Sequence, residues 1–245
     1  MTDIHCHILP RVDDGADSLE EALEMARMAA GSGVRAIIAT PHCNLPYEEA
    51  FNYASPDLLA RFTRLEQAIR AEGIPLDLLP GAEVLCTPQV PELAREGRLL
   101  TLAGSRYLLL EFFFDEELDY MEEMLCAVAE TGLVPVVAHP ERYGAIQRAP
   151  HVVERWFRTG YVVQLNKGSI LGRLGRRSAM AAEWILDHGL AHVVASDAHS
   201  PAMRTPQMGE LADHLRRCWG SEYTHILLRA NPGRILSDRP ILKAD

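Results

Sequence analysis

Apolar and polar residues alternate in two different patterns along this chain. Short runs rich in Val, Ile and Leu recur from one end to the other, and longer segments with apolar residues three or four positions apart lie between them. The short runs predict buried strands, and the longer segments predict amphipathic helices. Strands that alternate with helices in this way pair in parallel, so the pattern predicts an α/β fold.

The start and end signals of individual helices sharpen this prediction. Ser18 with Glu21 forms a capping box, and Gly33 suits the end of the helix that follows. Ser55 before Pro56 marks a second helix start, with an end near residue 73. After a first strand that leads to the residues around His5, we expect strands at residues 34–40, 78–85, 107–112, 134–138, 161–165 and 192–196, and further helices near residues 88–96, 116–130, 151–159 and 178–188.

These elements make about seven strand and helix units in series. The 245 residues contain no Gly/Ser linker and no break in composition, so we expect one domain over residues 1–245. No strand is followed by a G-x-G-x-x-G turn, which disfavours an open dinucleotide-binding sheet. A closed or nearly closed (β/α) barrel is therefore the expected architecture.

Composition excludes several classes of protein. A formal net charge of −10 argues against broad nucleic-acid binding, which needs many Lys and Arg contacts to phosphate. The five cysteines are widely spaced and form no C-x-x-C pair, which indicates reduced thiols. No apolar run is long enough to span a membrane, and the first residues do not resemble a signal peptide. We expect a cytoplasmic protein without membrane insertion.

The position of the ionisable residues carries the functional argument. Nearly every expected strand delivers a His, Asp or Glu at or just past its carboxyl end, which is the edge where barrel active sites are built. One such residue alone is usually a solvated or core side chain, but a series of them can converge on one rim. The series comprises His5, His7, Asp14, His42, Glu83, Glu111, His139, Asp197 and His199.

Spacing within this series indicates metal binding. His5 and His7 are two apart on a strand, so both side chains leave one face and can share an ion, and the same argument pairs Asp197 with His199. Glu83 and Glu111 sit in apolar runs, where a buried carboxylate without a partner is costly. A cation would explain all of these positions.

The donor types narrow the choice of metal and reaction. Imidazole and carboxylate without thiolate suit Mn, Fe or Zn, and nine donors indicate two or three ions and catalysis. The four carboxylates of the set contribute −4, so three divalent ions would leave +2 and favour an anion. Arg142, three residues after His139, and Arg204, expected at the start of a helix, are candidate phosphate-binding residues.

At these residues the chain resembles the PHP (polymerase and histidinol phosphatase) superfamily, and more closely the manganese-dependent bacterial protein-tyrosine phosphatases of capsule and exopolysaccharide synthesis. The matching motifs run in family order over almost the whole chain: Asp3-Ile4-His5-Cys6-His7, Asp13-Asp14-Gly15, Thr40-Pro41-His42, Gly81-Ala82-Glu83, Leu110-Glu111-Phe112, Ala138-His139-Pro140-Glu141-Arg142 and Ala195-Ser196-Asp197-Ala198-His199, with Arg204 beyond them. Residues 43–55 and 166–177 match no family motif.

The resemblance implies a distorted (β/α)7 barrel with three divalent ions held by the nine residues of the series. Manganese is the metal that it implies. It also implies that Arg142 and Arg204 bind phosphate, and that the substrate is a phosphotyrosine-bearing protein such as the tyrosine kinase that controls capsule synthesis. In the corresponding hypothesis, a hydroxide bridging two ions attacks phosphorus in line.

Cysteine-based phosphatase chemistry is a competing interpretation, because His5-Cys6 is followed by Arg11. Only four residues separate Cys6 from Arg11, whereas the phosphate-cradling loop of those enzymes has five, so we expect Cys6 to be a small core residue. The same residues also allow three rival functions. These are a PHP phosphoesterase for a small monoester such as histidinol phosphate, an amidohydrolase-type barrel that cleaves C–N bonds, and a catalytically silent metal-binding or kinase-docking module.

Overall fold

Parallel strands in two sheets form the centre of the protein. The computed structural model describes residues 1–45 and 51–243. One sheet has the order β1-β2-β4 and the other has the order β3-β5-β6-β7-β8-β9, and every pair is parallel. The strands are β1 (Thr2–Cys6), β2 (Ala36–Ala39), β3 (His42–Cys43), β4 (Asp77–Pro80), β5 (Glu83–Leu85), β6 (Tyr107–Glu111), β7 (Val134–Ala138), β8 (Val162–Asn166) and β9 (Val193–Ala195).

The prediction of a single strand at residues 78–85 is wrong in one respect. This segment forms two strands, β4 and β5, which belong to different sheets. Pro80 ends β4 because proline has no N–H for the ladder. Gly81 then passes so close to β2 that a Cβ at this position would lie 2.6 Å from Ile38 Cγ2. The pairing nevertheless continues in step, from Ala39 with Pro80 to His42 with Glu83.

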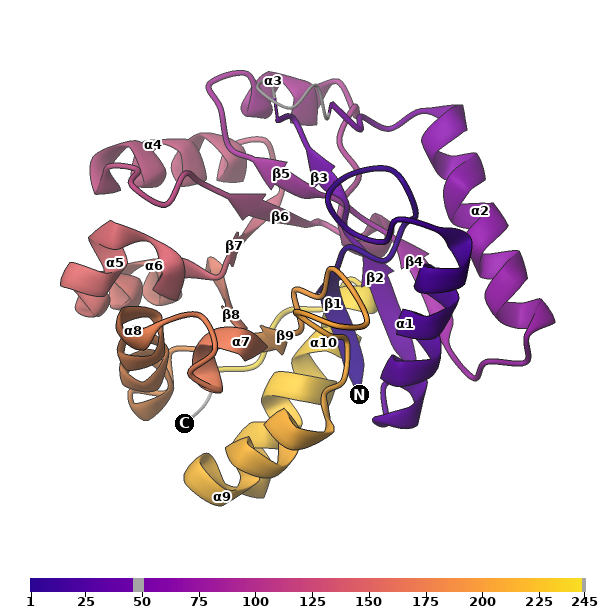
Figure 1. Ribbon diagram of the computed structural model, residues 1–245. Helices are drawn as coiled ribbons and strands as arrows, with labels where there is room; N and C mark the ends of the chain where they lie inside the picture. Colours follow the sequence, from indigo (N-terminus) through magenta and orange to yellow (C-terminus); the bar gives the residue numbers. More distant parts are fainter. Residues whose placement is uncertain (46–50, 244–245) are drawn as a thin grey trace.

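Helices surround the strands as an outer layer (Figure 1). Ser18 and Ser55 cap the helices that follow them, as predicted. Ser18 Oγ accepts from Glu21 N at 3.1 Å, and Ser55 Oγ accepts from Leu58 N at 3.2 Å. The helices predicted from the sequence are confirmed with shifts of a few residues at their ends, and they are α1 (Leu19–Gly31), α2 (Pro56–Ala71), α3 (Val90–Arg95), α4 (Leu118–Ala129), α6 (Val153–Thr159) and α8 (Arg176–Asp187).

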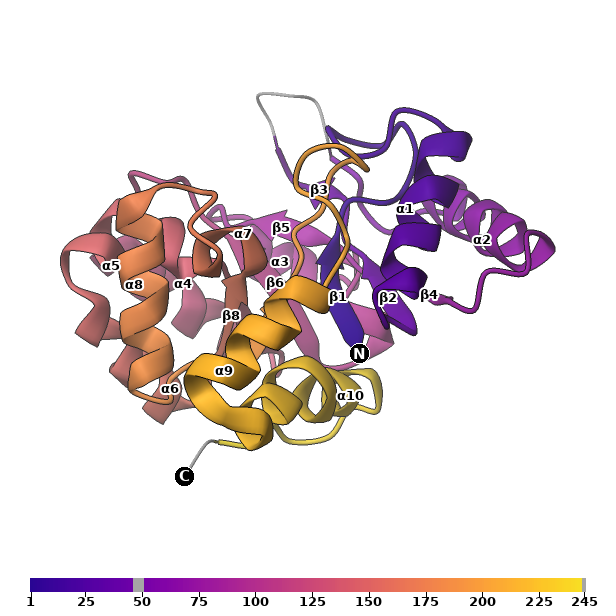
Figure 2. The same ribbon diagram turned by 60° about the horizontal axis from the view of Figure 1, so that its bottom comes forward.

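Within the described residues, the sequence pattern missed the α-helices α5 (Gly144–Arg148), α7 (Lys167–Ile170) and α10 (Asn231–Leu236), and it placed the start of α9 (Gly209–His225) five residues too early. The short α5 and α7 follow β7 and β8, and α9 and α10 close the chain. Figure 2 places α9 and α10 at the end of the molecule where β1 begins, opposite the loops that follow the strands. Every helix within the described residues is too short or too polar to cross a bilayer.

Two hydrophobic clusters hold these layers together. The larger cluster lies between helices and strands and includes Met25 of α1 and Leu65 of α2. The smaller cluster collects residues from six strands and is joined by Ile235 of α10. Its strand members are Ile4, Ile38, Tyr107, Leu109, Val136, Ala138, Val162, Val193 and Ala195. The strands are thus packed on both faces, as expected for parallel sheets.

Beside β9, the buried His192 is held in its neutral form. Its Nδ1 accepts from Val163 N at 3.0 Å, and its ring stacks on Phe157 at 4.6 Å between centroids. Burial, assisted by the nearby Lys243 ammonium, lowers the pKa of His192 to about 4. The folded protein therefore binds fewer protons here than the unfolded chain.

This difference predicts an acid-dependent loss of stability. The contribution of His192 is complete above its unfolded pKa of about 6.5 and falls as the pH drops toward 4, by about 2 kcal/mol at pH 5. The free energy of unfolding is measured by urea titration at pH 7 and pH 5. It should decrease less between these two pH values in His192→Gln than in wild type. The exposed His151→Gln is the matched control, and an unchanged slope in His192→Gln would contradict the assignment.

Candidate metal centre

The nine residues of the sequence series come together at or past the carboxyl ends of β1, β2, β4, β6, β7 and β9. His5, Glu83 and Glu111 lie in β1, β5 and β6, and His42 lies in the short β3. The remaining five residues lie in loops: His7, Asp14, His139, Asp197 and His199. Three groups have ligand atoms within 4.8 Å of one another; the groups are His5/His7/Glu83/Asp197, His7/Asp14/His42/His199 and His42/Glu83/Glu111.

The deepest group has four buried donor atoms directed at one point. His5 Nε2 and His7 Nε2 lie 3.2 Å apart, and Glu83 Oε2 is 3.0 and 3.2 Å from them. Asp197 Oδ1 lies 3.5 and 3.6 Å from the same two nitrogens. Atoms that each lie about 2.1 Å from one ion are separated by roughly 3.0 to 3.4 Å. The group has the spacing of a coordination shell.

Hydrogen bonds to the Nδ1 atoms of His5 and His7 fix the tautomer of each imidazole. His5 Nδ1 lies 3.0 Å from Gln164 Oε1, and His7 Nδ1 lies 2.7 Å from Asp13 Oδ2. Both oxygens are acceptors, so both Nδ1 atoms donate, and each neutral ring then has its lone pair on Nε2. Two lone pairs 3.2 Å apart repel each other unless a cation lies between them.

A second group lies nearer the surface and shares His7. Asp14 Oδ1 is 3.5 Å from His42 Nε2 and 3.3 Å from His199 Nε2. His42 also joins the third group through its Nδ1, which is 2.8 Å from Glu111 Oε1 and 3.3 Å from Glu83 Oε2. His139 belongs to none of the three groups, but its Nε2 lies 2.9 Å from Glu83 Oε1.

The carboxylates make this region strongly attractive to positive charge. Burial opposes a proton on His7, but the carboxylates of Asp13 and Glu83 raise its pKa well above the usual range. The pKa of His42 is raised to about 9 against burial and the neighbouring His7, because Glu83 and Glu111 are close. Positive charge must come either from protons or from bound cations. His139 Nδ1, Asp197 Oδ1 and His199 Nε2 are buried and have no hydrogen-bond partner among residues 1–45 and 51–243, which fits cations.

Two arginines face the same carboxylate at the edge of the cluster. Arg142 Nη1 lies 3.4 Å from Asp197 Oδ2, and Arg204 Nη2 pairs with the same oxygen. Both side chains retain some exposure and line one cavity of about 290 Å³ with Asp14, His42, Glu83, Glu111 and His139. An anion in this cavity would meet both the cluster and the guanidinium groups.

Two details of the sequence prediction are corrected by the structure. Arg204 is not at the start of a helix: it has φ +51° in a loop, and α9 begins only at Gly209. Pro206 explains this, because a proline disfavours helical geometry in the residue before it. Asp197 and His199 are near each other but not by strand alternation, since β9 ends at Ala195 and Asp197 has φ +50°.

Cys6 behaves as the sequence argument expects. It is completely buried in the larger hydrophobic cluster, while His5 and His7 turn toward the candidate ligands. Burial raises the pKa of its thiol well above the ordinary value. A thiol in this state is a poor nucleophile.

A model of one protein family matches residues 1–237, and its description is "Capsular polysaccharide synthesis, CpsB/CapC". The chain belongs to the CpsB/CapC family. It is 35% identical over 227 residues to tyrosine-protein phosphatase YwqE of Bacillus subtilis, covering 93% of this chain and 88% of the relative. It is also 29% identical over 246 residues to tyrosine-protein phosphatase CpsB of Streptococcus pneumoniae, covering 98% of this chain and all of the relative.

This chain is similar to a solved structure of the same family and, less closely, to solved structures of other proteins with a related fold. The crystallographic work on YwqE and CpsB, described as unique metal-dependent tyrosine phosphatases, includes a chain with a TM-score of 0.92 and 34% identity. That match covers all of this chain and 97% of the other. A dihydropyrimidinase from Brevibacillus agri has a TM-score of 0.59 at 10% identity, over 98% of this chain and 71% of that one. The latter likeness concerns the fold alone.

Several polar residues of this CpsB/CapC-family protein that support the cluster were missed from sequence. Asp13 has the sequence context of a turn residue, yet its Oδ2 accepts from both His7 Nδ1 and His42 N. Asn166 Nδ2 donates to Asp197 Oδ2, and Gln164 accepts from His5. Gln164 and Asn166 are polar residues two apart in the apolar run of β8. Glu83 was selected because it is polar within an apolar run, and the same criterion would have found these two residues.

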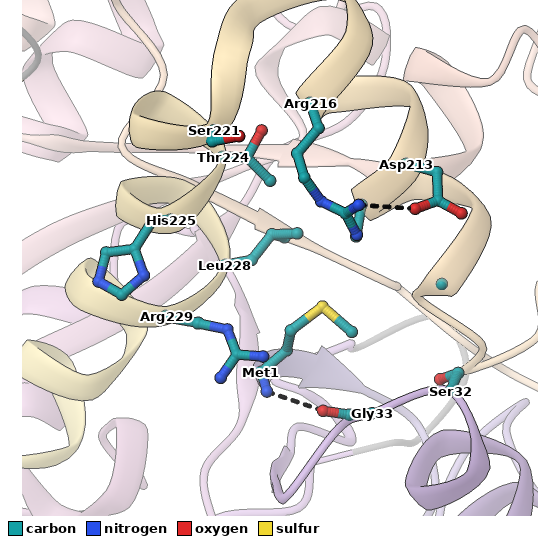
Figure 3. A pocket seen from close by; sticks show the side chains of 12 residues that line it. Met1, Ser32, Gly33, Asp213, Arg216, Ser221, Thr224, His225, Leu228 and Arg229 are labelled. Carbon is teal, nitrogen blue, oxygen red and sulfur yellow. Dashed lines mark hydrogen bonds and ion pairs between the residues drawn. The ribbon is translucent and has the colours of Figure 1, made fainter.

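A second cavity lies away from the family motifs, beside the amino end of β1 (Figure 3). It contains the Arg216–Asp213 pair at 2.9 Å and the Met1 ammonium, which donates to Gly33 O at 2.8 Å. Within the described part of the chain, none of the three candidate ligand groups includes a residue of this cavity. The chemistry is thus concentrated at the carboxyl ends of the strands.

The Asp13 contact predicts a role in metal affinity. Asp13→Asn weakens the acceptor that fixes the His7 tautomer, so we expect the affinity for Mn²⁺ to fall about 10- to 100-fold. Titration calorimetry should detect the loss while circular dichroism stays unchanged. The control is Asp17→Asn, at an exposed position of the same loop; equal affinities of wild type and Asp13→Asn would count against the role.

Proposed function

We propose that this chain is a metal-dependent phosphatase that hydrolyses phosphotyrosine on a protein involved in capsular or exopolysaccharide synthesis, such as a tyrosine kinase. The observation that carries the proposal is the pair Arg142 and Arg204 on the Asp197 carboxylate, at the edge of a cluster built for cations. The relatives named tyrosine-protein phosphatases support the choice of phosphotyrosine.

The nine residues of the series are proposed to hold three divalent ions, with manganese first and iron or zinc as substitutes. Three overlapping ligand groups support this number, with His7, His42 and Glu83 each shared by two groups. Imidazole and carboxylate donors suit these metals. When bound, such ions supply an activated water near neutral pH and neutralise phosphate charge.

The protein's own residues would orient the substrate. Arg142 and Arg204 would each present guanidinium N–H groups to the non-bridging phosphate oxygens. Asp197 holds both guanidinium groups toward the cluster, and Asp13 and Gln164 hold the imidazoles in one tautomer. The leaving phenolate has a pKa of about 10, so little proton donation is needed to expel it.

We further propose that the two sheets form one distorted (β/α)7 barrel within a single domain over residues 1–245. β2 with β3, and β4 with β5, would each occupy one strand position, which leaves seven. The ring would close between β1 and the end of β9, where Cys6 bridges Ala198. Two backbone hydrogen bonds support this closure: His7 N to Ala198 O at 2.8 Å, and Asp197 N to His5 O at 2.9 Å.

The function is tested with phosphotyrosyl peptide after manganese loading. We expect turnover that is lost in excess chelator and lost in His42→Ala, because His42 contributes to two ligand groups; the variant should keep its circular dichroism spectrum. The same assay should include histidinol phosphate as a small monoester. Full activity in excess chelator would disprove the metal-dependent reaction, and turnover of the small monoester alone would favour a small-molecule phosphoesterase.

The arginine assignment gives a separate prediction. Arg204→Ala removes a cation from the phosphate-binding edge, so kcat/KM should fall about 100-fold while the bound metal stays the same. Arg216→Ala removes an arginine that pairs with an aspartate in the distant cavity (Figure 3) and is the matched control. Similar losses in both variants would contradict a local role for Arg204.

A further inference from the structure

The cavity beside the cluster has an aromatic wall that the reaction described above does not use. Phe112, Phe113 and Phe114 follow β6 and line this cavity together with Leu45 and Leu85. Phe112 is buried, but Phe113 and Phe114 are 44% and 51% exposed. Exposed aromatic side chains gathered at a binding cavity mark a contact surface.

Hydrogen bonds fix this wall to the loop that carries Arg142. The Tyr143 hydroxyl accepts from Phe112 N at 3.1 Å and donates to Ala138 O at 2.8 Å. Gly144 N donates to Phe114 O at 2.7 Å. The backbone of the aromatic segment is therefore held on both sides of Phe113 without a bound ligand.

The Phe114 ring lies directly next to the phosphate-binding edge. The Arg142 guanidinium carbon is 4.4 Å from the ring centroid, within the range of a cation–π contact. The ring is also 6.3 Å from the His139 ring, and His139 contacts Glu83. A group attached to a phosphate bound between Arg142 and the cluster would thus lie beside Phe114.

We propose that Phe114 is the specificity-determining residue that receives the aromatic ring of the substrate, so that the site prefers aryl to alkyl phosphates. This inference rests on the proposed function, because it assumes that phosphate binds at Arg142 and the cluster. Aromatic rings pair favourably at centroid separations of about 4.5 to 7 Å, and the exposed part of the Phe114 ring offers such a partner. A short alkyl ester would leave this surface without a contact.

Binding of two non-hydrolysable ligands to the manganese-loaded protein tests the inference directly. Wild type should bind phenylphosphonate roughly three- to tenfold more tightly than methylphosphonate, the gain expected from one aromatic pair. In Phe114→Leu this ratio should fall clearly below the wild-type ratio, because the aromatic pair is lost, while Phe114→Tyr should keep it. The ratio cancels any effect of the Phe114 substitution on Arg142, because both ligands carry the same phosphonate group.

Met180→Ala removes another exposed apolar side chain, on α8, and is the control that should keep the wild-type ratio. A wild-type protein without a preference for phenylphosphonate would overturn the inference, as would an unchanged ratio in Phe114→Leu. Hydrolysis of phosphotyrosyl peptide by the same preparation separates the two claims. If wild type prefers phenylphosphonate, Phe114→Leu loses this preference and no peptide is hydrolysed, the proposed function fails and the role of Phe114 stands.

Discussion

The facing lone pairs of His5 and His7 are the constraint on which this site depends. Their Nε2 atoms lie 3.2 Å apart with two carboxylate oxygens beside them, in a region that water barely reaches. Such an arrangement is unfavourable by itself, because like partial charges are held together at low dielectric. It becomes favourable when a cation occupies the centre.

The parallel fold makes this concentration of charge possible. Carboxyl ends of adjacent strands meet at one edge, so short segments from distant parts of the chain can each contribute one ligand. Asp13, Gln164 and Asn166 lie behind the cluster and orient His7, His5 and Asp197 through hydrogen bonds. In the proposed function, the arginines would bind the phosphate and Phe114 would contact the group attached to it.

Much of this organisation could be predicted from the sequence, for physical reasons that differ from element to element. Strand β7 was predicted residue for residue because it is apolar and bounded by turn residues. The break between β4 and β5 was not predicted: Pro80 signals an interruption in the sequence, but the close approach of Gly81 to β2 is visible only in the fold. The place of His5 in the cluster was predicted from spacing, whereas Asp13 looks like any turn aspartate until the fold brings His7 and His42 to it.

Anomalous diffraction from manganese-soaked crystals tests the central claim most directly. We predict peaks at the centres of the three ligand groups, including one between His5, His7, Glu83 and Asp197. The peak in this deepest group should be lost in Asp197→Ala crystals. Crystals of the active protein with no manganese peak among these groups would contradict the claim that the cluster is a metal centre.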